Sequence, residues 1–446
     1  MHFTRRQFGL MMAAGLGAGA SPVPGNAATD TVPSPTNLAT TPSAAHQATY
    51  FFKNSAFEYV LLSSLGRAYH QGGNVGKVLY AIKQIEDGNF DSAYRTMIAA
   101  GDEMRAMAEA SASGNHHESA RQAYMWAQNF YDCATYFADG TGDPARIKTA
   151  WTLMDDCWSK SLRYFDPPIE QVSIPYENVA LRGFYFRARS RSKKRPLLIL
   201  VNGSDGSALD MWMLGAAGGT ARGYDCLTFD GPGQGYALWQ QRLTFRPDWE
   251  HVVTPVVDFA LGRPGVDPQR IAIQGISQGG YWVPRALAFE KRIAAAIVDP
   301  GVVDVSTSWT ATLPPPMLEL LKAGRNEEFD GYMSKELDAA TKNSLVFRMR
   351  PYGVTSYYDA FKATMDYNLT NVAGRIKCPV LITEPANEAF WPGQSRRLYD
   401  LITAPKTLLP FSASDGADLH CEPKGYGLRD LRVFNWLDDT LQSRRA

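Results

Sequence analysis

Apolar strands that alternate with amphipathic helices after residue 195 restrict the fold of this sequence more than any other feature. Pro196–Asn202 (PLLILVN) is an almost continuous apolar run, typical of a strand buried on both faces. We expect further strands at Tyr224–Asp230, Arg270–Gly275, Ile293–Asp299, Cys378–Glu384 and Lys406–Phe411, with helices at Trp249–Leu261, Gln278–Glu290, Gly393–Ile402 and Leu428–Leu441. This order predicts an α/β fold with a mostly parallel, doubly wound sheet.

Two other stretches precede this alternation, and a third interrupts it. Residues 48–165 carry apolar side chains at helical spacing, as at Phe57, Val60 and Leu61, and predict an all-helical domain of four to six helices. In the following domain, 166–446, the chain first forms two strands, Gln171–Tyr176 and Leu181–Arg187, expected to pair antiparallel. Residues of about 301–375 interrupt the alternation, are rich in aromatic side chains, and predict a cap inserted into the second domain.

The N-terminal residues read as a targeting segment rather than as part of the fold. Arg5 and Arg6 form a twin-arginine motif, and an apolar stretch from Leu10 to Ala20 follows it. This stretch is shorter than the roughly 20 residues that span a bilayer, so residues 1–28 resemble a Tat-type signal peptide. Residues 29–47 predict a linker, and the expected location is the periplasm or outside the cell. An uncleaved basic tail is the alternative.

Charge and cysteine content exclude several classes of protein. Lys and Arg number 45 and Asp and Glu also 45, so the net charge is zero, which argues against a nucleic-acid partner. The sequence contains no second long apolar run, so we expect no membrane attachment after signal cleavage. The five cysteines form no CxxC pair for zinc. In an oxidising compartment Cys133 and Cys157 form either a disulfide or two buried free thiols, and the sequence leaves both open.

A G-x-S-x-G pattern with Ser277 at its centre lies between the strand IAIQG and the helix that follows. This is the nucleophile elbow of α/β-hydrolases, in which a tight turn holds the serine above the sheet. The residues two before and two after, Gly275 and Gly279, are small because larger side chains would collide in this turn. The helix N-terminus also favours negative charge that develops beside Ser277.

The expected base is His420, in the loop between the last strand and the last helix. It is the histidine of the α/β domain that follows the serine, in the order Ser, acid, His that this fold requires, whereas His251 precedes the serine. The favoured acid is Glu388, in the loop after the strand Cys378–Glu384. Glu384, Asp299 and Asp304 are the alternatives.

An oxyanion hole requires two main-chain N–H groups. We expect one from Gln278, directly after the nucleophile, and one from Ser204, in the loop after the strand PLLILVN. Asp205, Asp304 and Trp391 are the expected substrate contacts. Aromatic side chains of the cap would suit an apolar or aromatic substrate, although they serve equally well as the core of the cap.

Around Thr228–Gly235 (TFDGPGQG) and His420–Pro423 (HCEP), the sequence resembles one branch of the α/β-hydrolases. Members of this branch carry a helical domain before a serine hydrolase domain, and they include 2,6-dihydroxypseudooxynicotine hydrolase and fungal enzymes that shorten aromatic polyketides. The resemblance extends over roughly residues 50–442. The acid in this branch is usually Asp, so Glu388 departs from its pattern. The resemblance also favours a homodimer, an assembly that the residues themselves leave open.

These features together predict a serine hydrolase with a Ser277–His420–Glu388 triad, an acyl-enzyme intermediate and no cofactor or metal. The substrate is expected to be a small, apolar or aromatic molecule with an ester or other acyl bond, with a C–C bond as a further possibility. The alternatives are a peptidase related to prolyl oligopeptidase, an acyltransferase, and a catalytically silent binding protein on the same fold.

Overall fold

The computed structural model describes residues 49–190, 192–311 and 313–442. The predicted signal peptide (1–28) and linker (29–47) lie outside these residues. Across the described ranges, no helix combines the length and the apolar character needed to cross a bilayer.

The first part of the described chain is helical. Its α-helices are α2 (Ser55–Gly66), α3 (Val75–Ile82), α4 (Phe90–Ser113), α5 (His117–Ala138) and α6 (Ala145–Ser161). Asparagine side chains cap the N-termini of three of these helices. Asn54, Asn74 and Asn89 each accept a hydrogen bond from a main-chain N–H group of the first turn. Helix α5 packs against both α4 and α6 and is buried around most of its circumference. We call α2–α6 the helical segment below.

An eight-stranded sheet follows the helical segment. Its strands are β1 (Glu170–Tyr176), β2 (Val179–Phe186), β3 (Arg195–Val201), β4 (Asp225–Phe229), β5 (Val266–Ile276), β6 (Ala295–Asp299), β7 (Val380–Pro385) and β8 (Lys406–Phe411). Their order in the sheet is β1-β2-β4-β3-β5-β6-β7-β8. The β1–β2 and β2–β4 pairs are antiparallel and every other pair is parallel. The predicted α/β fold, with its antiparallel strand pair at one edge, is confirmed.

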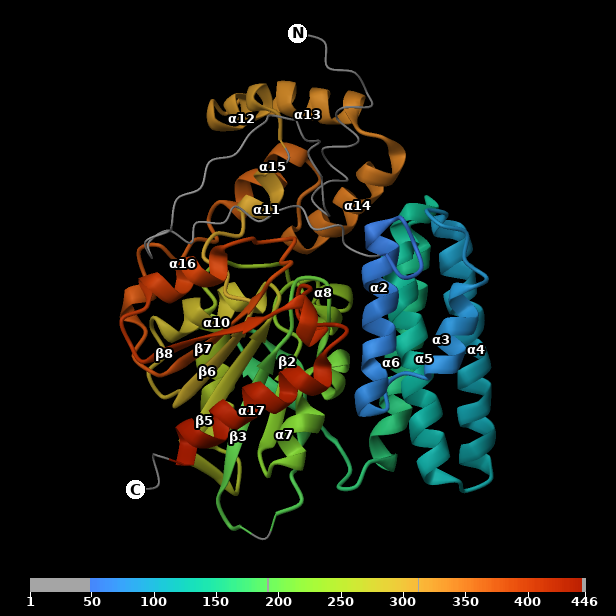
Figure 1. Ribbon diagram of the computed structural model, residues 1–446, viewed down its shortest axis with the longest axis vertical. Coiled ribbons are helices and arrows are strands. Elements are labelled where there is room, and N and C mark those ends of the chain that lie inside the picture. The colour runs from blue at the N-terminus through green and yellow to red at the C-terminus, as the bar shows by residue number, and fades with distance from the viewer. Residues whose placement is uncertain (1–48, 191, 312, 443–446) are drawn as a thin grey trace, which may run out of the picture.

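Alternate residues of β3 enter two different cores, which explains the continuous apolar run. Leu198 and Leu200 lie in the core under the helical segment, α7 (Ala217–Ala221) and α17 (Tyr426–Gln442). Leu197, Ile199 and Val201 lie in the core under α9 (Glu250–Leu261), α10 (Gly279–Leu287) and α16 (Gln394–Leu401). Because successive strand side chains point to opposite faces, a strand covered on both sides must be apolar at every position. Figure 1 shows the helical segment standing beside the sheet.

The chain between β6 and β7 forms a separate cluster of helices over one end of the sheet (Figure 1). Its helices are α11 (Thr307–Thr310), α12 (Pro315–Lys322), α13 (Asn326–Glu336), α14 (Ala339–Met349) and α15 (Tyr357–Thr364). This cap has a core of its own that includes Trp309, Phe329 and Phe361. The cap also contacts the helical segment, because Arg350 after α14 forms an ion pair of 2.7 Å with Asp139 after α5.

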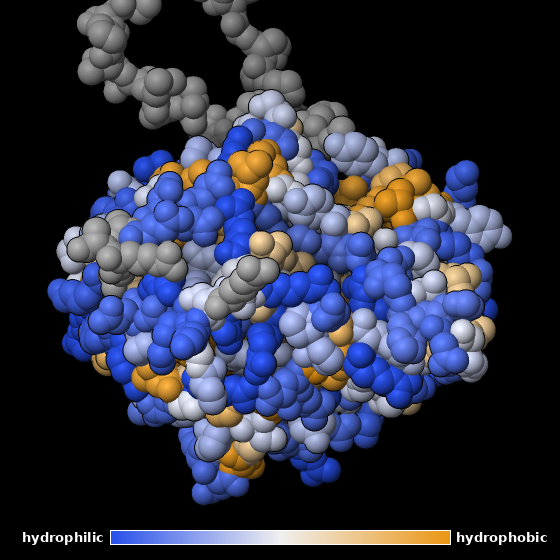
Figure 2. Space-filling model, turned by 90° about the horizontal axis from the view of Figure 1, so that it is seen from below, coloured by the Kyte–Doolittle hydropathy of each residue, from blue (hydrophilic) through white to orange (hydrophobic). Residues whose placement is uncertain are grey.

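Two details of the fold bear on the sequence predictions. Cys133 and Cys157 are both buried free thiols, which is one of the two alternatives that the sequence left open. Figure 2 shows a mostly hydrophilic surface on one face, with apolar residues in small separate groups. Among the described residues visible in this view, the apolar ones form no continuous area.

Candidate active site

Ser277 occupies a tight turn between β5 and α10. Its φ is +55°, in the left-handed region that non-glycine residues rarely adopt. The neighbours must be small, because a Cβ at Gly275 would lie 2.2 Å from the carbonyl oxygen of Gly279. The Ser277 N–H donates to the carbonyl of Asp299 at the end of β6, over 2.6 Å. The turn therefore holds the serine hydroxyl above the edge of the sheet, as the sequence pattern predicted.

A continuous chain of hydrogen bonds connects this hydroxyl to a buried carboxylate. His420 Nε2 lies 2.9 Å from Ser277 Oγ, and His420 Nδ1 lies 2.7 Å from Glu388 Oε2. The side chains of His420 and Glu388 are 5% and 6% exposed, so water competes little for these contacts. Three residues far apart in the sequence thus meet in the order that nucleophilic catalysis requires.

Glu388 is held in its ionised form. Burial alone would raise its pKa, but the neighbouring His420 and two main-chain N–H groups outweigh burial, and the net effect lowers the pKa of Glu388. Those N–H groups belong to Phe390 and Trp391 and donate to Oε1 over 2.8 Å and 3.0 Å. Because Oε1 is engaged there, Oε2 remains directed at His420. The carboxylate can therefore fix the orientation of the imidazole and stabilise its protonated form.

The other acids considered from the sequence contact different partners. Glu384 lies 3.4 Å from Arg396, toward solvent. Asp304 accepts hydrogen bonds from Ser306 and from Asn368. Asp299 is fully buried at the end of β6, where its carboxylate accepts the Thr383 hydroxyl over 2.7 Å. The structure brings none of these three carboxylates to His420.

The two main-chain N–H groups expected at the oxyanion hole belong to the residue that follows Ser277 and to the loop after β3. Within the described residues, neither the Gln278 N–H nor the Ser204 N–H has a hydrogen-bond acceptor. The loop that carries Ser204 approaches closely, since a Cβ at Gly203 would lie 2.5 Å from Ser277 Cβ. The buried Gln234 side chain holds this loop in place by donating to the carbonyls of Asn202 and Gly203, each over 2.8 Å.

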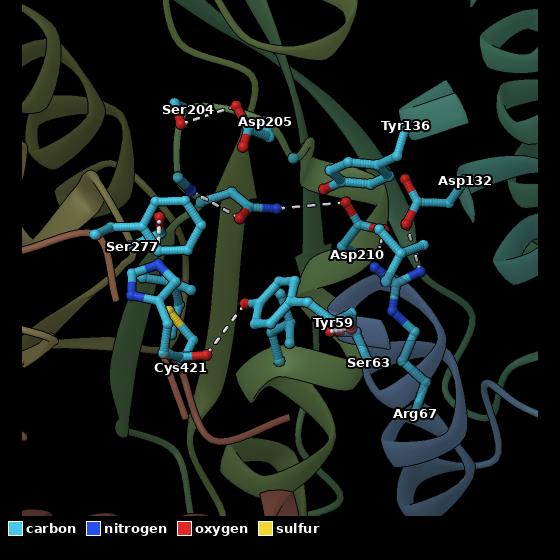
Figure 3. A pocket seen from close by; sticks show the side chains of 18 of the residues that line it. Tyr59, Ser63, Arg67, Asp132, Tyr136, Ser204, Asp205, Asp210, Ser277 and Cys421 are labelled. Atoms are coloured by element: carbon cyan, nitrogen blue, oxygen red, sulfur yellow. Dashed lines mark hydrogen bonds and ion pairs between the residues drawn. The ribbon is translucent and has the colours of Figure 1, made fainter. Parts of the chain in front are cut away.

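A cavity of about 100 Å³ opens in front of Ser277 (Figure 3). Its size is of the order of a roughly 150 Å³ cavity that admits a benzene ring. The α/β domain contributes Asn202, Gly203, Ser204, Asp205, Gly206, Asp210, Leu214, Ile276, Ser277, Phe390, Trp391, His420, Cys421 and Tyr426, and the cap contributes Arg348. Of the three expected substrate contacts, Asp205 and Trp391 line the cavity and Asp304 does not.

The helical segment supplies the rest of the wall, which the sequence did not reveal. These residues are Tyr59, Val60, Ser63 and Arg67 of the first helix and the 3₁₀ turn after it, and Asp132, Cys133 and Tyr136 of α5. The Tyr59 hydroxyl donates to the main-chain oxygen of His420 over 3.1 Å. Burial raises the pKa of Tyr59 well above its ordinary value, so this hydroxyl remains a donor. The spacing of four residues between Tyr59, Ser63 and Arg67 was the available signal, since it places polar side chains on one helix face.

The described residues contain no group of three or more His, Cys, Asp and Glu side chains that is arranged to bind a metal ion.

Comparison with known proteins places the chain among hydrolases. A family model described as the prolyl oligopeptidase family matches residues 222–348. The hydrolyase poxO of Penicillium oxalicum is 30% identical over 420 residues, which cover 89% of this chain and 99% of that protein. Hydrolase LUC6 of a Fusarium species and 20-hydroxy-prefusarin hydrolase FUS2 of Gibberella moniliformis are each 28% identical over 415 residues, covering 88% of this chain and 98% of each relative.

Solved structures share the architecture. 2,6-Dihydroxy-pseudo-oxynicotine hydrolase superposes with a TM-score of 0.65 at 18% identity, over 84% of this chain and 95% of that one. The protein AbyA5 superposes with a TM-score of 0.59 at 16% identity, over 88% of this chain and 99% of that one. At these identities the likeness concerns the fold.

Proposed function

Since the chain belongs to the α/β-hydrolase family that includes the fungal hydrolyase poxO, we propose that it hydrolyses an acyl bond through Ser277, His420 and Glu388. The observation that carries this proposal is the unbroken hydrogen-bond chain from Ser277 Oγ through His420 to Glu388. A serine hydroxyl is a weak nucleophile until an adjacent base accepts its proton. Here His420 is that base, and Glu388 is the carboxylate that orients it.

In the first half of the reaction, His420 Nε2 accepts the Ser277 hydroxyl proton while Oγ attacks the substrate carbonyl carbon. The carbonyl oxygen becomes an oxyanion that accepts hydrogen bonds from the Gln278 and Ser204 N–H groups, both of which are free to donate. The tetrahedral intermediate then breaks its bond to the leaving group, which takes the proton from His420. The products of this half are the acyl-enzyme and the protonated leaving group.

In the second half, His420 accepts a proton from water as the water oxygen attacks the acyl carbon. A second oxyanion forms in the same hole and collapses, the bond to Ser277 Oγ breaks, and Oγ recovers the proton from His420. Glu388 accepts the Nδ1–H bond throughout and remains ionised, in keeping with its lowered pKa. Each turnover therefore consumes one water and releases an acid.

Hydrolysis of nitrophenyl esters by the wild-type protein and by Ser277→Ala tests this proposal. We expect the wild type to release nitrophenolate with saturation kinetics and the variant to lose at least about 10³-fold in kcat. His251→Ala is a matched control, because this side chain is 62% exposed on α9 and lies outside the cavity wall. Equal rates in wild type and Ser277→Ala would contradict the proposal.

We infer the kind of acyl group and the bond that is cleaved from the side chains around Ser277. Phe390 and Trp391 pack beside His420, with ring centroids 4.6 Å and 5.8 Å from the imidazole, so the reacting carbonyl has aromatic neighbours. A small aromatic or apolar acyl group suits this wall. A panel of aryl esters and β-diketones of matched size separates ester from C–C cleavage, and we expect the esters to react faster.

A peptidase is the second candidate, because the prolyl oligopeptidase family model matches the residues around Ser277. Chromogenic dipeptide amides test this activity. Turnover of these amides with a kcat/KM equal to or above that of the esters would favour the peptidase over the esterase.

We also propose that the protein is exported in a folded state. The support is the Arg5–Arg6 pair and the apolar stretch after it, which lie outside the described residues. Cell fractionation of the full chain, beside a variant in which both arginines are lysine, tests this localisation. An unchanged distribution of the variant would contradict it.

A further inference from the structure

The cavity wall contributed by the helical segment differs in character from the aromatic wall around His420. Tyr59, Ser63 and Arg67 follow one another at intervals of four residues, and Asp132 and Tyr136 stand opposite them on α5. Figure 3 shows the Arg67, Asp132 and Tyr136 side chains grouped on the side of the cavity away from Ser277. A polar end of the cavity thus faces the reacting end.

This polar end contains more negative than positive charge. Arg67 Nη1 lies 2.6 Å from Asp132 Oδ2, and Arg67 Nη2 lies 3.4 Å from Asp210 Oδ1. All three residues are at least nine-tenths buried. One guanidinium therefore serves two carboxylates, and the cluster carries an excess of one negative charge when both are ionised. A buried excess charge is costly unless another partner compensates it.

Both Nη atoms of Arg67 already have partners. Nη1 also donates to Asn129 Oδ1 over 3.1 Å, and Nε is sealed from the cavity without a partner. The acceptors are not all used, because Asp132 Oδ1 and the Tyr136 hydroxyl have no hydrogen-bond partner in the described residues. The free groups that a ligand meets here include a carboxylate oxygen and a hydroxyl.

Asp132 is also accessible from two directions. Together with Ser204, Asp205 and Gly206 it lines a second cavity of about 40 Å³, which extends to Trp239 of α8 (Gly235–Trp239). Its side chain is only 5% exposed, so both cavities reach a carboxylate that bulk solvent hardly touches. Burial and the neighbouring Asp210 raise the pKa of Asp132 above its ordinary value, and Arg67 opposes this effect only in part.

We propose that Arg67, Asp132 and Tyr136 form a binding subsite for a hydrogen-bond-donating group of the substrate, a hydroxyl or an amine, at the end of the acyl group away from the reacting carbonyl. The donor hydrogen bonds to Asp132 Oδ1 and Tyr136, and an ammonium group would also neutralise the excess charge. A carboxylate in the same place would meet Asp132 and be rejected. This subsite rests on the proposed acyl hydrolase function, because it assumes that the substrate carbonyl lies at Ser277.

The test uses aryl esters with acyl chains of matched length that end in a methyl, a hydroxyl, an ammonium or a carboxylate group. We expect kcat/KM of the wild type to be higher, by about tenfold or more, for the hydroxyl or ammonium ester than for the methyl ester, in line with a charge-assisted hydrogen bond. The carboxylate ester should be the poorest substrate. Preference for the ammonium ester alone identifies charge pairing, and preference for both identifies hydrogen bonding.

Asp132→Asn assigns the preference to this residue. The amide oxygen is expected to face Arg67, which turns the amide NH₂ toward the cavity and replaces an acceptor by a donor. The ratio of kcat/KM between the donor ester and the methyl ester should fall about tenfold. Asp156→Asn, on the exposed side of α6, is the matched control and should keep the wild-type ratio. Should Asp132→Asn fail to fold, Tyr136→Phe is expected to lower the same ratio by severalfold.

Binding of the four esters to Ser277→Ala, measured by calorimetry, keeps the subsite separate from catalysis. Tighter binding of the donor esters that is lost on adding Asp132→Asn supports the subsite, even if the wild type turns over none of the esters. A lack of turnover would refute the acyl hydrolase function alone. Equal affinities for all four esters would overturn the subsite. So would a ratio that neither Asp132→Asn nor Tyr136→Phe changes.

Discussion

Replacing Glu388 with glutamine should abolish most of the activity without removing any catalytic atom of Ser277 or His420. The glutamine keeps Oε1 in place to accept the N–H groups of Phe390 and Trp391, so its side-chain position is fixed. The amide NH₂ then takes the place of Oε2, which lies 2.7 Å from His420 Nδ1. Two donors at that distance repel each other, so the imidazole must shift its proton from Nδ1 to Nε2.

The magnitude follows from this change of tautomer. With the proton on Nε2, His420 directs a donor at Ser277 Oγ over 2.9 Å and cannot accept the hydroxyl proton. The corresponding change in a serine protease triad lowers kcat by about 10⁴-fold, or ~5.5 kcal/mol of transition-state stabilisation. We expect a loss of this order for Glu388→Gln, measured as kcat on a nitrophenyl ester at neutral pH.

Glu384→Gln is the matched control, because Glu384 precedes Glu388 by four residues and forms its ion pair with Arg396 instead. It should keep kcat within about twofold of the wild type. A kcat of folded Glu388→Gln within tenfold of the wild type would contradict the assignment of Glu388 as the triad acid, as would a large loss of kcat in the Glu384 control.

The same variant should alter the pH dependence of stability. The pKa of Glu388 is lower in the folded protein than in the unfolded chain, so its contribution to stability is fully present above the unfolded value, near ~4.3, and is lost as the pH falls through the folded value. Urea unfolding of the wild type and Glu388→Gln from neutral pH to below pH 4 measures this. The difference in the free energy of unfolding between the wild type and Glu388→Gln should become smaller toward acid pH. A difference independent of pH would contradict a lowered pKa of Glu388 in the folded protein.

The remaining predictions concern residues around the site. Gln234→Glu loses two N–H donors that hold the oxyanion loop, and we expect kcat to fall by about 10- to 100-fold in ester hydrolysis, with a smaller change in KM. Tyr59→Phe loses the hydrogen bond to the histidine loop and should lower kcat by roughly threefold to tenfold, while an unchanged kcat would argue against its positioning role. Gly275→Ala should destabilise the protein in urea unfolding by about 3 kcal/mol or more, whereas Gly331→Ala, a helical site with open space, should be neutral or stabilising by up to about 1 kcal/mol.

The sheet and the nucleophile could be predicted because their signals are local in the sequence. The central strands of the α/β domain contain short apolar runs, such as LLILV in β3 and IAI in β5, and the glycines beside Ser277 follow from the geometry of one turn. His420 followed from chain order together with the small number of histidines. The short π-helical turn Trp212–Ala216 and α7 between β3 and β4 were not predicted, because the Gly- and Ala-rich stretch there shows no helical periodicity.

The wall contributed by the helical segment could not be predicted, because its contacts connect residues far apart in the chain. Tyr59 and His420 are separated by 361 positions, and nothing near either residue indicates the other. Periodicity identified the apolar face of α2, but a polar face that lines a cavity has the same pattern as one that faces water. The choice among Glu388, Glu384 and Asp304 likewise depended on which carboxylate reaches the imidazole, a distance that only the folded chain defines.

Labelling with a fluorophosphonate, followed by peptide mapping, measures whether Ser277 is an activated nucleophile. We expect the wild-type protein to form one covalent adduct, located on Ser277, and Ser277→Ala to form none. Glu388→Gln should form the same adduct far more slowly. A folded wild-type protein that forms no adduct, or one that Ser277→Ala also forms, would contradict the claim that Ser277 is an activated nucleophile.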